Sequence, residues 1–168
     1  MNSNFILNII RFILLIAIQI LILNQIKFDG WINPYIYVLF IILYPINSNK
    51  YGFLIASFLI GLTIDTFSDS GGVHTTASLI LAYIRPLFLR FSFGLSYEYQ
   101  TIKIAEKLTL DRFLFIAICI FTHHLILFSL ELYQFDLFFD IIFRTIFSSI
   151  FTFIICVISI YLIRSNKK

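Results

Sequence analysis

The side chains that could do chemistry in this chain are few, and most of them lie inside long apolar stretches. Asp65 and His74 lie on either side of a glycine turn that includes Gly72, so the two side chains can meet where two helices join. An aspartate beside a histidine can bind a metal, move protons or hold a substrate. Two ligands are too few for a closed metal site, however. The alternative, which we favour, is a polar cap that fixes the turn between two helices.

A second group of polar residues lies further along the chain. His123 and His124 are adjacent, and Glu131 follows His124 by seven residues, on the same helical face. Adjacent residues of a helix point about 100° apart, so the two histidines cannot bind one ion together. Asp140 and Arg144 are four residues apart, which suits an ion pair within a helix. We expect the histidines to make internal hydrogen bonds, or a polar network with Glu131 and Arg144 near the outer leaflet.

Arg85 and Pro86 form a third polar feature within an apolar stretch. Proline removes one helical hydrogen bond and usually kinks a helix. Arg85 has three alternative roles: it can cap the freed carbonyl groups, extend to the inner headgroups, or bind a buried acid. We interpret Arg85 as extending to the headgroups.

No familiar catalytic pattern is present, because the sequence lacks a Ser/His/Asp order, GxSxG, HExxH and a phosphate-binding glycine run. Cys119 and Cys156 have no CxxC spacing and lie in apolar stretches, which favours a role as small buried residues. No basic patch with interleaved aromatic residues indicates nucleic-acid binding. The residues therefore predict a protein that is not an enzyme, without a cofactor, a metal or a nucleic-acid partner.

The elements that position these residues are apolar enough to cross a lipid bilayer. Of the 168 residues, 60% are hydrophobic, more than a soluble core of this size can bury. Crossing about 30 Å of hydrocarbon takes about 20 helical residues. The sequence therefore predicts an all-α polytopic transmembrane helical bundle that forms a single integral membrane domain over residues 1–168. Six helices are predicted, at about 5–23, 32–46, 51–67, 73–91, 113–132 and 137–163.

Five helices are the alternative count, because residues 32–46 reach only about 22 Å as a helix. Ser57 and Gly61 form a small-residue pair, four positions apart, that would let another helix approach closely. The longest connection, residues 92–111, is predicted to hold a short amphipathic helix on the cytoplasmic membrane surface.

The distribution of lysine and arginine predicts the orientation of the chain. With six spans and a cytoplasmic N-terminus, only Lys27 falls in an outer loop. An excess of basic residues marks the cytoplasmic side, so both termini are expected there. The inner side then holds eight basic residues: Lys50, Arg90, Lys103, Lys107, Arg112, Arg164, Lys167 and Lys168.

Glycine and polar residues of the third to sixth spans follow a characteristic order. The pattern is Gly61-Leu62-x-x-Asp65-x-Phe67, Gly72-x-His74-x-x-Ala77 and Ala82-Tyr83-x-Arg85-Pro86, followed by His123-His124-x-x-x-Phe128-x-x-Glu131 and Arg144-x-x-x-Ser148. This order resembles the MreD family of rod shape-determining proteins, in its Bacteroidetes-type form. The motif is scattered rather than compact, and it includes no catalytic signature.

The resemblance implies a non-catalytic subunit of the cell-elongation (rod) complex in the bacterial inner membrane. Such a protein binds the bitopic protein MreC and links it to MreB filaments, RodA and the RodA-associated transpeptidase. It thereby regulates cell shape and lateral peptidoglycan synthesis. The resemblance also implies the six-helix architecture of the substrate-binding subunits of energy-coupling vitamin transporters. Asp65, His74 and Arg85 match recurrent polar positions of the family, without a defined chemistry.

Two alternative functions follow from the same residues. A small-molecule-binding membrane subunit of an energy-coupling transporter would have a polar pocket near the outer surface, around Asp65, His74, His123 and Glu131. A membrane enzyme would use His124 and Glu131, but it has no motif behind it. A scaffold would instead dock a partner's helix at Ser57 and Gly61. The candidate structural or partner-binding residues are Ser57, Gly61, Asp65, Gly72, His74, Arg85, Pro86, His124, Glu131 and Arg144.

Overall fold

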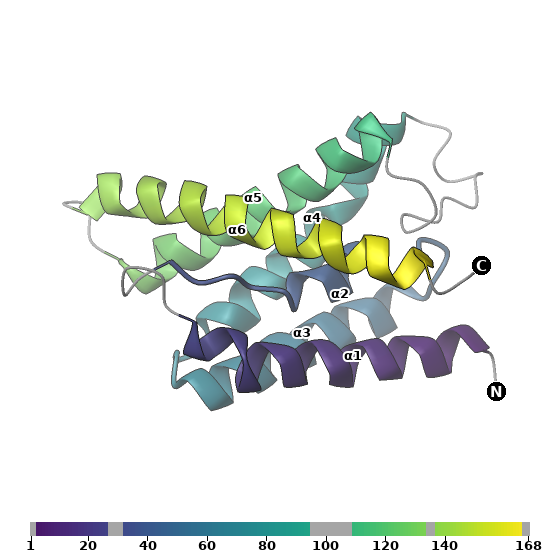
Figure 1. Ribbon diagram of the computed structural model, residues 1–168, viewed down its shortest axis with the longest axis horizontal. Helices are drawn as coiled ribbons and strands as arrows, with labels where there is room; N and C mark the ends of the chain where they lie inside the picture. The colour runs from purple at the N-terminus through teal and green to yellow at the C-terminus, as the bar shows by residue number, and fades with distance from the viewer. Residues whose placement is uncertain (1–2, 27–31, 95–108, 134–136, 166–168) are drawn as a thin grey trace.

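The chain folds as an all-α bundle of long apolar helices, as the sequence predicts (Figure 1). The computed structural model describes residues 3–26, 32–94, 109–133 and 137–165. In these ranges five helices are long and apolar enough to cross a membrane, so the alternative count of five is the one confirmed and the chain is an integral membrane protein. They are α1 (Ser3–Leu21), α3 (Lys50–Ser68), α4 (Val73–Phe93), α5 (Leu110–Glu131) and α6 (Phe138–Ser165).

The helices pack mainly in chain order. α3 packs against α4, α4 against α5 and α5 against α6, while α1 lies against α3. A short 3-10 helix, η1 (Leu23–Gln25), follows α1. Large apolar side chains remain exposed on all five long helices, because hydrocarbon rather than water surrounds them. α4 continues through Pro86 to Phe93.

The predicted second spanning helix at residues 32–46 is wrong. Residues 32–37 are not helical, and only the six residues of α2 (Val38–Leu43) form a helix there. The cause is local: Pro34 lacks an N–H group and disfavours helix in the residue before it, and Pro45 does the same just after α2. Between the two prolines lie residues 35–44, which is less than three turns of helix, and α2 takes six of these residues.

Residues 32–49, which we term the crossing segment, nevertheless pass through the bundle. Figure 1 shows them running from the end where α1 finishes to the end where α3 begins. Pro34 to Leu43 are buried, and Tyr37, Val38, Ile41 and Ile42 are wholly inaccessible. Over the described ranges the chain therefore traverses the bundle six times, five times as a spanning helix and once as a largely non-helical buried segment.

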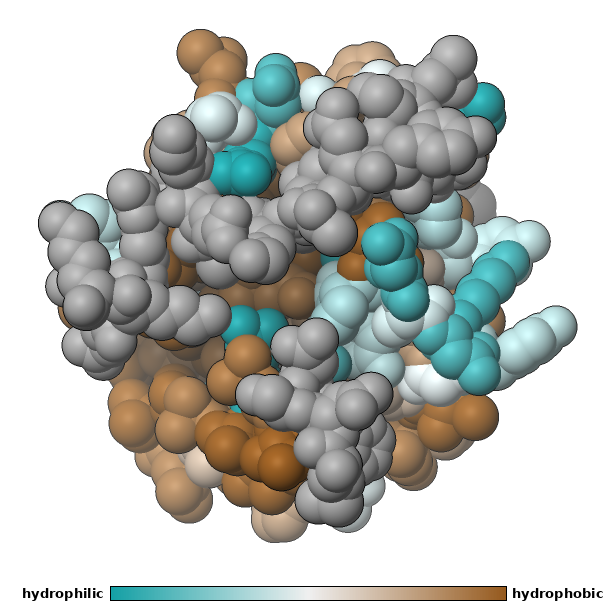
Figure 2. Space-filling view, turned by 90° about the vertical axis from the view of Figure 1, so that its right-hand side faces the viewer, coloured by the Kyte–Doolittle hydropathy of each residue, from teal (hydrophilic) through white to brown (hydrophobic). Residues whose placement is uncertain are grey.

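α1 begins at the same end of the bundle at which α6 ends (Figure 1). Hydrophilic side chains gather on part of this end face, while apolar ones surround its lower edge (Figure 2). An even number of traverses agrees with two termini on one side. That this side is cytoplasmic remains a prediction, and most of the predicted amphipathic loop, residues 95–108, lies outside the described residues.

α3 and α4 approach each other closely at Gly61. A Cβ atom at this position would lie 2.5 Å from Thr75 Cα and 2.8 Å from the carbonyl oxygen of His74. Ser57, one turn earlier, is fully buried and donates a hydrogen bond to the carbonyl oxygen of Phe53 (2.9 Å). The small-residue pair thus serves packing inside this chain. Our expectation that Ser57 and Gly61 dock a partner's helix is therefore wrong.

This contact predicts the effect of adding one methyl group. Gly61→Ala should destabilise the protein by about 1–3 kcal/mol, the usual cost of overpacking, because the obstructing atoms belong to backbone and cannot move aside. The thermal unfolding midpoint of the detergent-purified protein would measure the loss. Gly52→Ala is the matched control, because a Cβ atom at position 52 would lie 4.0 Å from its nearest neighbour, Asn49 Cβ. Equal midpoints for the two variants would contradict the close approach.

Candidate functional site

Several buried polar residues of the bundle make hydrogen bonds to the crossing segment. A backbone that is neither helical nor in contact with water must find its hydrogen bonds elsewhere. Gln19 of α1 donates from Nε2 to the carbonyl oxygen of Pro34 (3.1 Å). Thr152 of α6 accepts a hydrogen bond on Oγ1 from the backbone N–H of Tyr35 (2.9 Å). Helices at opposite ends of the sequence therefore hold the first half of the crossing segment.

Arg85 of α4 holds the second half. Its Nη2 atom donates to the carbonyl oxygens of Ile42 (3.1 Å) and Tyr44 (2.6 Å), at the C-terminal end of α2. Pro45 has no N–H group to offer Ile42 in a tightened last turn, so another donor is needed there. The guanidinium carbon also lies 5.2 Å from the centre of the Phe53 ring, within cation–π range.

Arg85 is only 3% exposed, so our interpretation that it extends to the headgroups is wrong. It caps carbonyl groups, which was one of the alternatives, although these belong to the crossing segment. A charge in the membrane is stabilised here by backbone dipoles at a helix C-terminus and by aromatic faces.

Tyr37 of the crossing segment connects α4 with α5. Its hydroxyl oxygen lies 2.7 Å from Nδ1 of His74 and 3.0 Å from Nε2 of His123. A hydroxyl has one proton, so it donates to one of the two rings and accepts from the other. Both histidines are buried, and the Tyr37 ring meets each of them edge-on. His74 therefore faces the crossing segment rather than the Asp65 carboxylate.

His124 makes its own contacts with α5 and α6. Its Nδ1 atom lies 2.7 Å from the carbonyl oxygen of Ile120, which can only accept, so Nδ1 carries the proton. Nε2 then accepts from the Thr152 hydroxyl, 3.1 Å away. The same hydroxyl accepts from the Tyr35 N–H group, so hydrogen bonds run from Tyr35 through Thr152 and His124 to the carbonyl oxygen of Ile120. The expectation that the two histidines make internal hydrogen bonds is confirmed.

Asp65 caps the N-terminus of α4. Its Oδ1 atom accepts from the backbone N–H of His74 (3.0 Å) and from Ser70 Oγ (2.5 Å), and Oδ2 accepts from the backbone N–H of Thr75 (2.7 Å) and from its hydroxyl. The first amide groups of a helix lack partners and favour a negative charge. Gly72 takes a left-handed conformation in the turn (φ 95°). This is the polar cap that the sequence predicts.

Four predicted residues lie apart from this network of buried contacts. Glu131 ends α5 with an exposed side chain, and Arg144 lies half-buried in α6; both interact with other groups of the chain. Asp140 is exposed in the first turn of α6, and its ion pair with Arg144 stays a prediction. Pro86 is exposed on α4.

Sequence reasoning missed Gln19 and Tyr37, which are completely buried. A signal for both existed in the prolines that bracket residues 35–44. A broken helix in a membrane leaves polar backbone groups without partners, and polar side chains on neighbouring spans are the groups able to satisfy them. Gln19 interrupts an apolar helix and is such a group.

The fold and this network define a class: an all-α polytopic membrane protein whose intramembrane polar residues hold a non-helical crossing. In the part of the chain that the structure describes, no three His, Cys, Asp or Glu residues are grouped so that they could hold a metal ion. The comparisons with known proteins add no relative. No family model matches the chain, and neither a curated protein nor a solved structure matches it.

The contacts of Arg85 predict the result of removing its donors. Arg85→Met keeps most of the length of the side chain but leaves the carbonyl groups of Ile42 and Tyr44 without their charged partner. The expected loss is about 1.5–3 kcal/mol, the usual contribution of a hydrogen bond to a charged group.

Thermal unfolding in detergent would measure this loss. Arg90→Met is the matched control, because Arg90 lies in the last turn of the same helix and is exposed. If the two variants unfold at the same temperature, the carbonyl groups of Ile42 and Tyr44 do not depend on Arg85.

Proposed function

We propose that the protein is a non-catalytic subunit of the cell-elongation (rod) complex, of the MreD type. The observation that carries the proposal is the use of the motif residues. Gly61 allows α3 to meet α4, Asp65 caps α4, His74 bonds to Tyr37, and Arg85 holds the end of the crossing segment. The residues that resemble the MreD pattern are thus residues on which this bundle depends, so the resemblance concerns architecture.

The state of the polar residues supports a scaffold rather than an enzyme. His123 and His124 are inaccessible, and each is engaged with another residue of the chain. A general acid or base must instead reach a substrate within hydrogen-bonding distance. The surface that the protein offers is formed by apolar helices, which suits contact with transmembrane helices of other proteins.

In this proposal the protein lies in the bacterial inner membrane with both termini in the cytoplasm. It binds an MreC-type bitopic protein and links that protein to MreB filaments, RodA and the associated transpeptidase. It acts without a cofactor or nucleic acid, and its effect is on cell shape and lateral peptidoglycan synthesis.

The alternative of a transporter's binding subunit gains no support from the residues that would form its pocket. Asp65, His74 and His123 are each less than 10% exposed and already make hydrogen bonds within the chain. A substrate would have to displace those contacts.

Affinity purification of the tagged chain from native membranes, after brief crosslinking, tests the proposal. Mass spectrometry should recover the bitopic rod-complex protein and the wall synthases, and depletion of the chain should make rod-shaped cells round. An unrelated polytopic protein with the same tag is the control. Recovery of a transmembrane coupling subunit with paired ATPases, or unchanged cell shape after depletion, would overturn the proposal.

A further inference from the structure

Arg11 of α1 is a charged side chain that finds no partner in the described part of the chain. It is half-buried and lies five residues after Ile6, where the apolar span of this helix begins. Among the described residues it makes no hydrogen bond, ion pair or ring contact. Arg85 and Arg144, which also lie within spanning helices, both interact with other groups of the chain. A charge within a span needs a partner, so that of Arg11 comes from outside the described chain.

Asn8 is a second polar group on the same side of α1. The inward face of this helix is marked by Leu15 and Gln19, which are buried. Residues three and four apart are neighbours on a helix, so Asn8 and Arg11 continue this face toward the N-terminus. Both are only half-buried, because the bundle covers this part of α1 incompletely. A long helical side chain leans toward the N-terminus of its helix, which brings Arg11 over the turn that holds Asn8.

The depth of Arg11 matches the level of the lipid headgroups. Its Cα atom lies about 7.5 Å from Ile6 along the helix, at 1.5 Å per residue. An arginine can lay its apolar stem along such a distance and present its charge at the membrane surface. A soluble anion would have to leave water to reach a half-buried group, which is costly. The phosphate of a lipid is held at this level by its own acyl chains.

The apolar neighbours of Arg11 favour a lipid over a helix of another protein. Leu7, Leu14 and Leu15 are the residues four before, three after and four after it, and Leu7 and Leu14 are exposed. Helices in membranes associate closely where small residues let their backbones approach. Leucines keep a second helix at a distance, whereas flexible acyl chains can lie along them.

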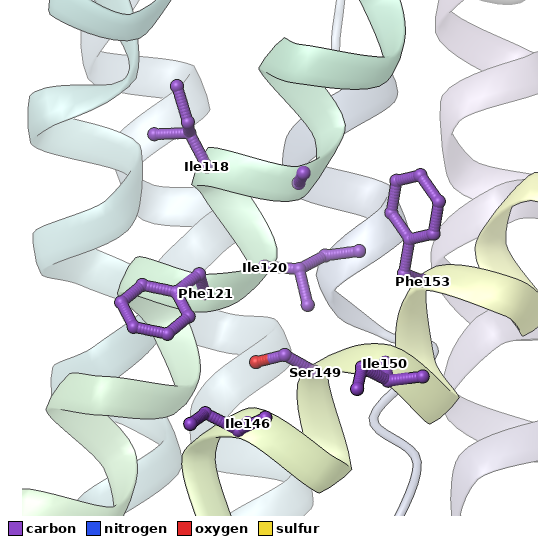
Figure 3. A pocket seen from close by; sticks show the side chains of 8 residues that line it. Ile118, Ile120, Phe121, Ile146, Ser149, Ile150 and Phe153 are labelled. Atoms are coloured by element: carbon purple, nitrogen blue, oxygen red, sulfur yellow. The ribbon is translucent and has the colours of Figure 1, made fainter. Parts of the chain in front are cut away.

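The apolar surface elsewhere on the bundle offers no comparable selectivity. A cleft of about 510 Å³ lies between α5 and α6, and Figure 3 shows its walls, such as Phe121, Ile150 and Phe153. None of the residues that line it is charged. Apolar walls of this kind can contact an acyl chain of any lipid or the apolar face of a helix. Arg11, in contrast, specifies an anion.

We propose that Arg11 and Asn8 bind the phosphate of one anionic phospholipid, whose acyl chains lie along Leu7 and Leu14. A guanidinium group can donate two parallel hydrogen bonds to phosphate oxygens, and the amide of Asn8 is a further donor. The lipid is anionic, because a zwitterionic headgroup carries a cation that already neutralises its phosphate. Phosphatidylglycerol fits this description. The site is independent of the function proposed above.

Native mass spectrometry of the whole chain, purified in detergent and freed of lipid, tests the site. Phosphatidylglycerol and phosphatidylcholine with the same acyl chains are the probes. The protein should retain one phosphatidylglycerol at concentrations at which phosphatidylcholine is lost. Arg11→Gln should weaken this retention about tenfold or more, the effect of losing hydrogen bonds to a charged group. Asn8→Ala should weaken it several-fold. Equal retention of the two lipids, or equal retention by Arg11→Gln and the unchanged protein, would overturn the proposal.

Two variants separate the site from general effects of charge and folding. Arg90→Gln removes an exposed cation from α4 and should leave the retention unchanged. Arg11→Lys keeps the charge without the paired donors, so its retention should be intermediate. In the lipid-free state Arg11→Gln should unfold at the same temperature as the unchanged protein, because Arg11 has no partner in the described chain. A clear drop there, or an equal loss of lipid in Arg90→Gln, would contradict the site.

Photo-crosslinking in living cells separates a lipid from an acidic group of another protein. A benzophenone amino acid in place of Leu14 should form adducts with lipid, and Arg11→Gln should reduce their yield. An adduct to the transmembrane segment of another protein that disappears in Arg11→Gln would identify a carboxylate of that protein as the partner of Arg11. The lipid site would then be wrong.

Discussion

The structure depends on one constraint, which is that the buried backbone of the crossing segment must hydrogen-bond without water. A helix satisfies its own backbone, but the prolines at 34 and 45 prevent a long helix between them. The neighbouring helices supply what is missing: Gln19 from α1, Arg85 from α4 and Thr152 from α6. Polar residues that look scattered in the sequence thus share one physical purpose. An arginine and three histidines are tolerated in an apolar bundle because they have partners.

This constraint also decides where function can lie. An interior whose histidines and aspartate are committed to hold the fold leaves little room for a substrate. The free features are on the outside, where apolar helices face the membrane and a cleft separates α5 from α6. This arrangement agrees with the scaffold role proposed above. The crossing segment ties α1, α4, α5 and α6 to one another through its hydrogen bonds.

The helical fold and part of the site could be predicted from the sequence. Hydropathy over about 20 residues is a local signal, and it found α1, α3, α4, α5 and α6. The cap at Asp65 was predictable too, since a glycine turn brings it close to the start of α4. Hydropathy missed the crossing segment, because apolar side chains of a buried irregular segment and of a helix look alike in composition; Pro34 and Pro45 were the signal of a broken helix. Its partners are also distant in sequence: Tyr35 and Thr152 are 117 positions apart, and nothing local specifies such a pair.

Cysteine labelling from the two sides of the membrane tests most directly whether the crossing segment traverses the bundle. Gln25 precedes the segment, Asn47 lies near its end, and both are exposed, so each can be changed to cysteine in a chain that carries Cys119→Ala and Cys156→Ala. A membrane-impermeant maleimide should label the two positions from opposite sides, as a segment that crosses the bundle requires. Labelling of both from the same side would mean that residues 32–49 return to the surface from which they entered, and the central claim would be wrong.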